Sequence, residues 1–283
     1  MRYDTVVTHD IGFYAGRTLR DVGVKEPPIP IDPILAYFDI ELVGIDDSSV
    51  DELRRRAGLE MHVPAFMIAR GDDAQIVIKA GDSLERQRLS VLHEIGHYDL
   101  PWHNGYDFAC ECASIPDIGL KGFEREAFEY AGLILFPQGC FVADATSMPT
   151  EIATIKALSH RYVASFEATT IRYVQAHPGL CAAVYIEPNS NDDDSEHPFR
   201  VRYAVKSKRF HRYWRAGDGI TYDDSIAVCM NDRVPIETEL PATVFGSTRG
   251  HDYVVDLKPH GINQVCALLR MDDPQTSFLG GLI

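Results

Sequence analysis

The stretch that decides the fold is residues 89–97, LSVLHEIGH. Its apolar residues recur at three-residue spacing, which predicts a helix over residues 85–98 with one apolar face. Residues four apart share a face of a helix, so the imidazoles of His93 and His97 can bind one ion. Glu94 lies one position further round, close enough to take a proton from a water that the ion activates. This HExxH arrangement is typical of zinc peptidases, in which zinc lowers the pKa of water toward about 7.

A catalytic zinc requires a third protein ligand, and two residues compete for that place. His103 has the third-ligand spacing of metzincins. In that pattern a glycine turns the chain before the third histidine, but here Leu100 stands at its position and Pro101 follows. Glu124 stands near the start of the next predicted helix, residues 122–136, and a glutamate from a second helix is the other common solution. The residues alone leave both open. Glu126 and Glu129 fall on other faces of that helix, where we expect them to be solvated.

Together with its surroundings, the motif resembles the ImmA/IrrE family of metallo-endopeptidases. The resemblance covers roughly residues 28–180. It rests on the entry PIDP at residues 30–33, the helix RQRLSVLHEIGH at residues 86–97, and EREAFEYAGLILFP at residues 124–137. The predicted helix pair over residues 152–175 is similar to the family's stretch after the second motif. We interpret this pair as packing against the core rather than as a DNA-reading helix-turn-helix, because its second helix has few basic residues.

The resemblance implies a set of site residues. Aligning the family's closing proline with Pro137 puts its ligand glutamate on Glu124. The implied cofactor is therefore one Zn²⁺ per chain, held by His93, His97 and Glu124. Glu94 would act as the catalytic base and later return the proton to the leaving amine.

The resemblance also implies a substrate class. Members of the family cut repressor-type DNA-binding regulators or act as partners of such regulators. We therefore expect a zinc endopeptidase whose protein substrate is a helix-turn-helix regulator; the alternative is a non-proteolytic regulatory or antitoxin-type binding module that keeps the fold. Two positions depart from the family pattern: Phe128 replaces an asparagine and Phe136 replaces a methionine. The chain also has no N-terminal helix-turn-helix, so any DNA binding would belong to a partner.

The overall pattern predicts an α+β protein. We expect an extended N-terminal arm over residues 1–30, a zincin-like peptidase domain with a small sheet over 31–180, and a strand-rich mixed domain with a sensory or partner-binding role over 181–283. The C-terminal strands are predicted at residues 181–186, 199–205, 226–230, 253–257 and 264–269. Candidates for stabilising an oxyanion are Tyr98, His103 and Tyr130. The substrate is expected to add along an edge strand formed by Gln75, Ile76, Val77, Ile78 and Lys79.

Composition limits the remaining function classes. Lys and Arg number 27 against 42 Asp and Glu, a net charge of −15, which argues against a broad phosphate-binding surface. The sequence shows no apolar run of the roughly 18–20 residues that a membrane span needs, no secretory signal segment and no dense set of cysteines. We therefore expect a cytoplasmic location and no membrane or direct nucleic-acid partner. The Cys110 and Cys112 pair is too short a pattern to predict a second metal site. The basic-aromatic stretch over residues 206–215 is interpreted as charges flanking core aromatics rather than as a binding patch.

Overall fold

The computed structural model describes residues 10–46, 48–49, 52, 65–70, 73–103, 122–189, 196–247 and 251–271. The chain forms two compact units: unit 1 is Met1–Phe141 with Ser159–Ser165, and unit 2 is Val142–Leu158 with Phe166–Ile283. The elements of unit 1 are α1 (Ile11–Val22), α2 (Asp32–Phe38), β1 (Ile40–Ile45), β2 (Ala65–Arg70), β3 (Asp73–Lys79), α4 (Leu84–Asp99), the 3-10 helix η1 (Pro101–His103) and α5 (Gly122–Leu135). The elements of unit 2 are α8 (Phe166–Ala176), β4 (Cys181–Pro188), β5 (Phe199–Lys206), β6 (Gly219–Ile220), α9 (Asp224–Asn231), β7 (Ile236–Pro241), β8 (Asp252–His260) and β9 (Gln264–Arg270), and the helices α6 (Gln138–Thr146) and α7 (Ile152–Tyr162) have residues in both units.

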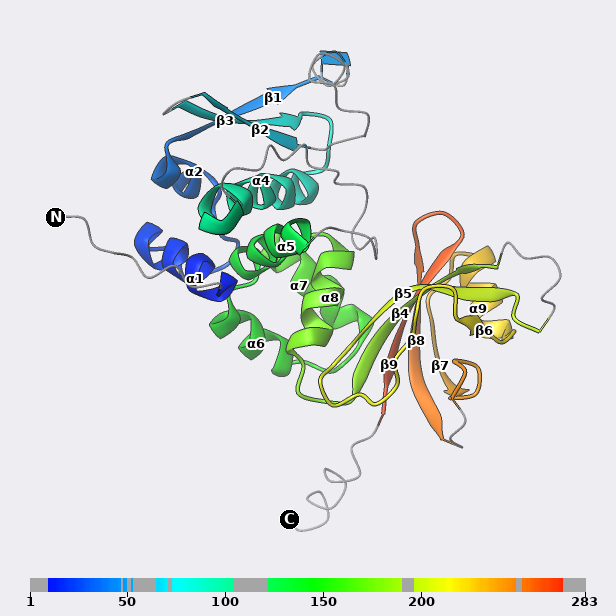
Figure 1. Cartoon of the computed structure of the whole chain (residues 1–283). Coiled ribbons are helices and arrows are strands. Elements are labelled where there is room, and N and C mark those ends of the chain that lie inside the picture. The colour runs from blue at the N-terminus through cyan, green and yellow to red at the C-terminus, as the bar shows by residue number, and fades with distance from the viewer. Residues whose placement is uncertain are drawn as a thin grey trace, which may run out of the picture. The chain divides into compact units, whose positions relative to one another are not determined.

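The layers of unit 1 place α4 at its centre. A three-stranded sheet of order β1-β3-β2 contacts α4 through β2 and β3, and α5 packs on another side of the same helix (Figure 1). β3 is the central strand, parallel to β1 and antiparallel to β2. The prediction that Gln75, Ile76, Val77, Ile78 and Lys79 form the edge is therefore wrong. The reason is β1, which the sequence pattern did not reveal because most of its side chains are partly or fully exposed.

The prediction of an extended N-terminal arm is wrong for residues 11–22, whereas residues 24–30 belong to no helix or strand. Residues 11–22 form α1, which buries Tyr14, Ala15 and Thr18 against the unit. The Asp10 side chain caps the helix by accepting a hydrogen bond from the Phe13 amide at 3.2 Å. Gly23 ends the helix in the left-handed conformation, with φ of 76°. The Asp10 cap and Gly23 are local helix signals in the sequence. The prediction of extended chain rested instead on the prolines over residues 27–30.

Two features fix α4 in its place. Gly96 allows α5 to approach closely, because a Cβ atom at this position would lie 3.2 Å from both the Cα and the carbonyl oxygen of Ala127. Arg88 is buried and donates from Nε to the Val163 carbonyl at 3.0 Å and from Nη2 to the Ile29 carbonyl at 2.8 Å. Near its first residues α4 is thus held by hydrogen bonds from the Arg88 side chain to two carbonyls. Near its last residues it is held by close packing of Gly96 on α5.

Unit 2 is built on a six-stranded antiparallel sheet of order β6-β5-β4-β9-β8-β7. The helices α8 and α9 cover opposite faces of this sheet (Figure 1), which explains why residues 181–186 of β4 are buried without alternation. Four of the five predicted C-terminal strands are confirmed in β4, β5, β8 and β9. The strand predicted over residues 226–230 is wrong: this short apolar run lies in α9, which Asp223 caps. The units also divide the chain differently from the expected boundary near residue 180, because α8 packs on β4 and β5.

Candidate metal centre

Three side chains of unit 1 converge on one point. His93 and His97 project from α4, and Glu124 from the first turn of α5. The two His Nε2 atoms are 3.2 Å apart; Glu124 Oε2 lies 3.2 Å from His93 Nε2, and Glu124 Oε1 lies 3.4 Å from His97 Nε2. The side chains are 1%, 5% and 9% exposed. We call His93, His97 and Glu124 the metal cluster, because their ligand atoms all lie within 4.8 Å of one another.

The chemistry of the metal cluster suits a divalent ion such as zinc. Two imidazole nitrogens and one carboxylate oxygen are a common ligand set for catalytic zinc. A ligand must be deprotonated to bind. Burial alone would raise the pKa of Glu124, but hydrogen bonds and charge interactions with His93 and His97 outweigh it and lower this pKa to about 2. Glu124 is therefore a carboxylate across the neutral range.

Glu94 is buried in the same turn of α4 as the metal cluster. Its exposed fraction is 2%, whereas a glutamate without a role in a site is seldom buried. It directly follows His93, as the motif requires for a residue that handles a proton beside the ion rather than binding it. The predicted catalytic residue thus lies inside unit 1 with the predicted ligands.

The two candidates for the third ligand occupy different sides of His97. Glu124 faces the Nε2 atoms, whereas His103 Nδ1 lies 3.0 Å from His97 Nδ1, on the far edge of that ring. His103 Nε2 is 3.0 Å from Glu126 Oε2, and Trp102 donates to the same oxygen from Nε1 at 2.6 Å. The Glu126 side chain is 27% exposed, so the expectation that it is solvated holds only in part: one carboxylate oxygen is engaged by Trp102 and His103.

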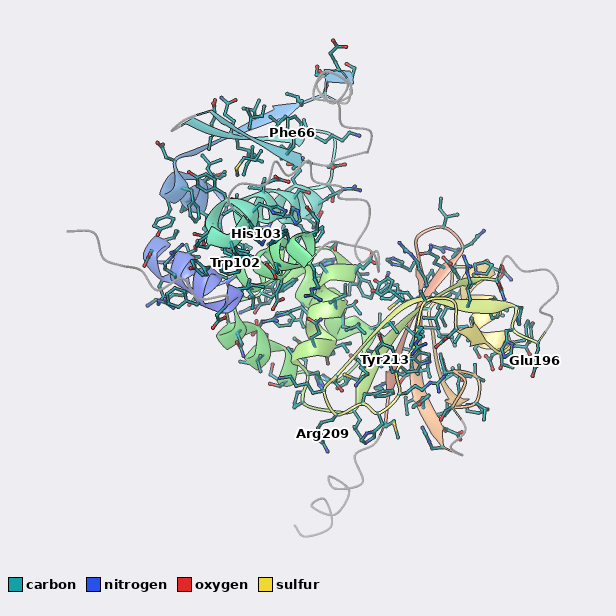
Figure 2. All side chains as sticks on the ribbon, in the orientation of Figure 1. Phe66, Trp102, His103, Glu196, Arg209 and Tyr213 are labelled. Carbon is teal, nitrogen blue, oxygen red and sulfur yellow. The ribbon has the colours of Figure 1, made fainter. Side chains whose placement is uncertain are left out.

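The pKa values of His103 and Glu126 depend on burial and on the hydrogen bonds between them and Trp102. Burial lowers the pKa of His103, which favours the neutral imidazole. Burial also opposes ionisation of Glu126, but the hydrogen bonds from Trp102 and His103 outweigh it and lower the pKa of this carboxyl. A neutral imidazole beside a carboxylate is the charge state expected. Trp102 and His103 lie next to each other beside α4 and α5 (Figure 2).

A phenylalanine of α5 lies against one of the three side chains of the metal cluster. The ring of Phe128 packs on that of His93, with centroids 4.2 Å apart. Phe128 also packs against Phe66 of β2 and Val77 of β3. One face of the His93 ring is thus covered by an apolar contact, which connects the metal cluster to the small sheet.

The tyrosines predicted as oxyanion stabilisers make other contacts. Tyr98 is 40% exposed, and its ring packs edge-on against Phe38. Tyr130 is fully buried; its hydroxyl donates to Asp99 Oδ2 at 3.0 Å and lies 3.0 Å from Thr18 Oγ1. Arg17 forms an ion pair with the other Asp99 oxygen.

A separate polar group, which we call the Asp99 cluster, consists of Arg17, Thr18, Asp99 and Tyr130. Burial raises the pKa of Asp99, although Arg17 and the two hydroxyls oppose the rise. Burial and the neighbouring Asp99 charge raise the pKa of Tyr130 well above its usual value. Asp99 was not among the predicted site residues: it stands two residues after the motif and one residue beyond the helix predicted over residues 85–98, whereas α4 extends to include it.

Two weaker sequence features can be placed only in part. Cys110 and Cys112 lie outside the described residues. In the stretch over residues 206–215, Phe210 and Trp214 are buried in the core of unit 2. Arg209 and Tyr213 are exposed (Figure 2), so the charges flank core aromatics as interpreted.

Comparisons with known proteins bear on the fold alone. No protein-family model matches the chain, and no curated protein is significantly similar to it. Among solved structures, a Mycobacterium tuberculosis transcriptional regulator is similar with a TM-score of 0.55 and 14% sequence identity, over 93% of this chain and 87% of that chain. At this identity the similarity shows a shared fold that includes both units. Within the described part of the chain, no helix is both long and apolar enough to cross a membrane.

Proposed function

We propose that this protein is a zinc-dependent endopeptidase. The observation that carries the proposal is the convergence of His93, His97 and Glu124 within 4.8 Å, with Glu94 buried in the same helical turn. A structural zinc site is closed by protein ligands and needs no base, whereas three protein ligands beside a buried glutamate suit a catalytic site. The donor set and the base together favour hydrolysis.

Each residue has a definite task in this proposal. His93, His97 and Glu124 would hold a divalent ion, which would lower the pKa of a bound water and polarise the carbonyl of the substrate. Glu94 takes the proton of the attacking water on its carboxylate and gives it to the leaving amine. Glu124 is engaged as an ionised ligand in this proposal, and Glu94 is the carboxylate that carries the proton. Burial of both groups strengthens these electrostatic interactions.

The substrate edge must be moved from β3 to β2. β2 is an edge strand of the small sheet and contacts α4, and its Phe66 packs with Phe128, which in turn touches His93. A peptide that pairs with β2 through its backbone would run beside the metal cluster. By resemblance, the substrate class is a helix-turn-helix, repressor-type regulator.

The decisive experiment compares the wild-type chain with a Glu94→Gln variant. We expect each to bind one zinc ion, measured by elemental analysis of the purified full chain, because Glu94 is not a ligand. Fragments of a regulator encoded beside this protein, identified by mass spectrometry, should appear with wild type only. Glu129→Gln, on the exposed side of α5, is the matched control and should cleave normally. A wild-type chain that binds no zinc, or a Glu94→Gln variant that cleaves equally well, would contradict the proposal.

The same experiment tests a second candidate function. It is suggested by the name of a similar solved structure, which is a transcriptional regulator. In this alternative the protein is a non-proteolytic regulatory or antitoxin-type module that keeps the fold. It predicts stable binding of the partner regulator by wild type and by Glu94→Gln alike, with no fragments from either.

A further inference from the structure

We propose that His103 and Glu126 form a hydrogen-bonded chain that positions His97 as a metal ligand. The inference rests on the proposed function and adds two positioning residues to the centre. His103 is 1% exposed and follows α4 in η1, and Glu126 is one of the first residues of α5. Neither residue faces the point where the three ligand atoms converge.

The order of donors and acceptors along this chain is fixed by the metal. When His97 binds an ion through Nε2, the proton of its neutral ring must be on Nδ1. That N–H points at His103 Nδ1, 3.0 Å away, which must then carry no proton and accept the bond. The proton of His103 is consequently on Nε2, and it is donated to Glu126 Oε2 at 3.0 Å. Each contact obtains one donor and one acceptor, and a protonated His103 would place two N–H groups against each other.

The far end of the chain is anchored independently of the histidines. Trp102 donates to the same Glu126 oxygen at 2.6 Å, and the Phe123 ring packs edge-on to His103 at 4.9 Å. Glu126 lies two residues after Glu124 on α5. One helix therefore supplies a ligand directly and also orients a second ligand through His103, so the position of α5 sets both.

This arrangement differs from simple packing in what it requires of residue 103. Packing needs a ring of the right shape, whereas the chain needs an acceptor toward His97 and a donor toward Glu126. His103→Phe keeps the ring and removes both nitrogens. His103→Gln replaces the ring by an amide whose oxygen can accept from His97 and whose NH₂ group can donate to Glu126.

The test is zinc affinity of the full chain, measured by competition with a chromophoric chelator. Loss of a partner that orients a metal-binding histidine typically weakens affinity about 10–100-fold, and we expect this for His103→Phe. His103→Gln should recover most of the loss. Glu126→Ala, compared with the exposed Glu129→Ala on the same helix, should also weaken binding while the control does not. The absorption spectrum of the Co²⁺-loaded proteins should shift in His103→Phe and Glu126→Ala, because the His97 ligand is reoriented.

The outcomes separate this inference from the proposed function. Zinc bound equally well by wild type and His103→Phe would overturn the inference and leave the metal centre in place. Equal weakening by Phe and Gln would also overturn it, since shape rather than donor order would then matter. A wild-type chain without zinc affinity would remove the proposed function, and the inference with it. Thermal unfolding of each metal-free variant identifies folding defects. The comparison of Glu126→Ala with Glu129→Ala tests the hydrogen-bonded chain without substituting a residue of η1.

Discussion

Two polar clusters of unit 1 share the helices α4 and α5, the Asp99 cluster adding α1, and they differ in how their charges are balanced. The Asp99 cluster joins a carboxylate of α4 to Arg17, Thr18 and Tyr130. It contains its own cation, and its hydroxyls and guanidinium meet the oxygens of Asp99. The metal cluster instead directs two imidazole nitrogens and both oxygens of Glu124 at one point.

The difference separates a cluster that stabilises the fold from one that is suited to a ligand. Buried charges need a partner, and Asp99 has one in the protein. For Glu124 the positive charge must come from a protonated imidazole or from an ion supplied from outside. Changes to the Asp99 cluster should therefore reduce stability and leave metal binding close to that of wild type, whereas changes to the metal cluster should reduce metal binding.

Removing the carboxylate of the Asp99 cluster should have the largest effect on stability. Asp99→Ala leaves Arg17 without its partner, and we expect a loss of about 3 kcal/mol in the free energy of unfolding, the low end for a broken buried pair because Arg17 is partly exposed. Urea unfolding of the metal-free protein measures the loss. Zinc affinity of the folded variant should stay close to that of wild type. Weaker zinc binding with unchanged stability would show that the two clusters are not separate in function.

In the metal-free protein, the metal cluster should make the free energy of unfolding depend on pH. The pKa of Glu124 is about 2 in the folded chain against an ordinary value of 4.5, so its contribution to stability is full above about pH 4.5 and is lost as pH falls toward 2. The shift corresponds to about 3 kcal/mol at neutral pH. Glu124→Gln should therefore be less stable than wild type at pH 7, with a gap that narrows below pH 4.5.

The control for this pH dependence is Glu129→Gln, an exposed glutamate of the same helix. Its stability should differ little from that of wild type at any pH. A gap between wild type and Glu124→Gln that stays constant from pH 7 to pH 3 would mean that the imidazoles do not hold Glu124 in its charged form.

The sequence predicted the metal cluster because its signal is local. The spacing of His93 and His97 on one helix is sufficient to bring them together, and the pattern of α5 placed Glu124 opposite them. Even so, the residues left His103 and Glu124 as rivals, and the choice depended on a resemblance. The structure separates them because they lie on opposite edges of the His97 ring, which no spacing along the chain expresses.

The missed features are those fixed by contacts between distant segments. The central place of β3 depends on β1, about thirty residues earlier, and the short apolar run of residues 76–78 cannot show that pairing. Glu126 was assigned to solvent from its helical position, yet Trp102 and His103 cover it from a neighbouring segment. The apolar run in α9 fits a strand or a helix, and only its Asp223 cap favours the helix.

The close approach of the two helices offers a test that affects both clusters at once. Gly96→Ala would place a Cβ 3.2 Å from backbone atoms of Ala127, so α4 and α5 must separate. We expect a loss of about 2 kcal/mol from overpacking, together with weaker zinc binding because Glu124 moves away from the histidines. Gly132→Ala is the matched control, since its Cβ would meet nothing within 4 Å; it should gain up to about 1 kcal/mol in stability. If Gly96→Ala matched Gly132→Ala in both measurements, helix spacing would not set the metal cluster.

The smallest effect should come from Tyr130→Phe, which removes only a hydroxyl from the Asp99 cluster. Because that hydroxyl donates to Asp99, its loss should cost about 1 kcal/mol in urea unfolding. The rate of regulator cleavage should be unchanged, since the hydroxyl is already engaged in the Asp99 cluster. Loss of a true oxyanion donor lowers kcat about 10²–10³-fold. A drop of that size with unchanged stability would assign Tyr130 to the reaction after all, and the boundary between the stabilising cluster and the ligand-binding cluster would then run through this residue.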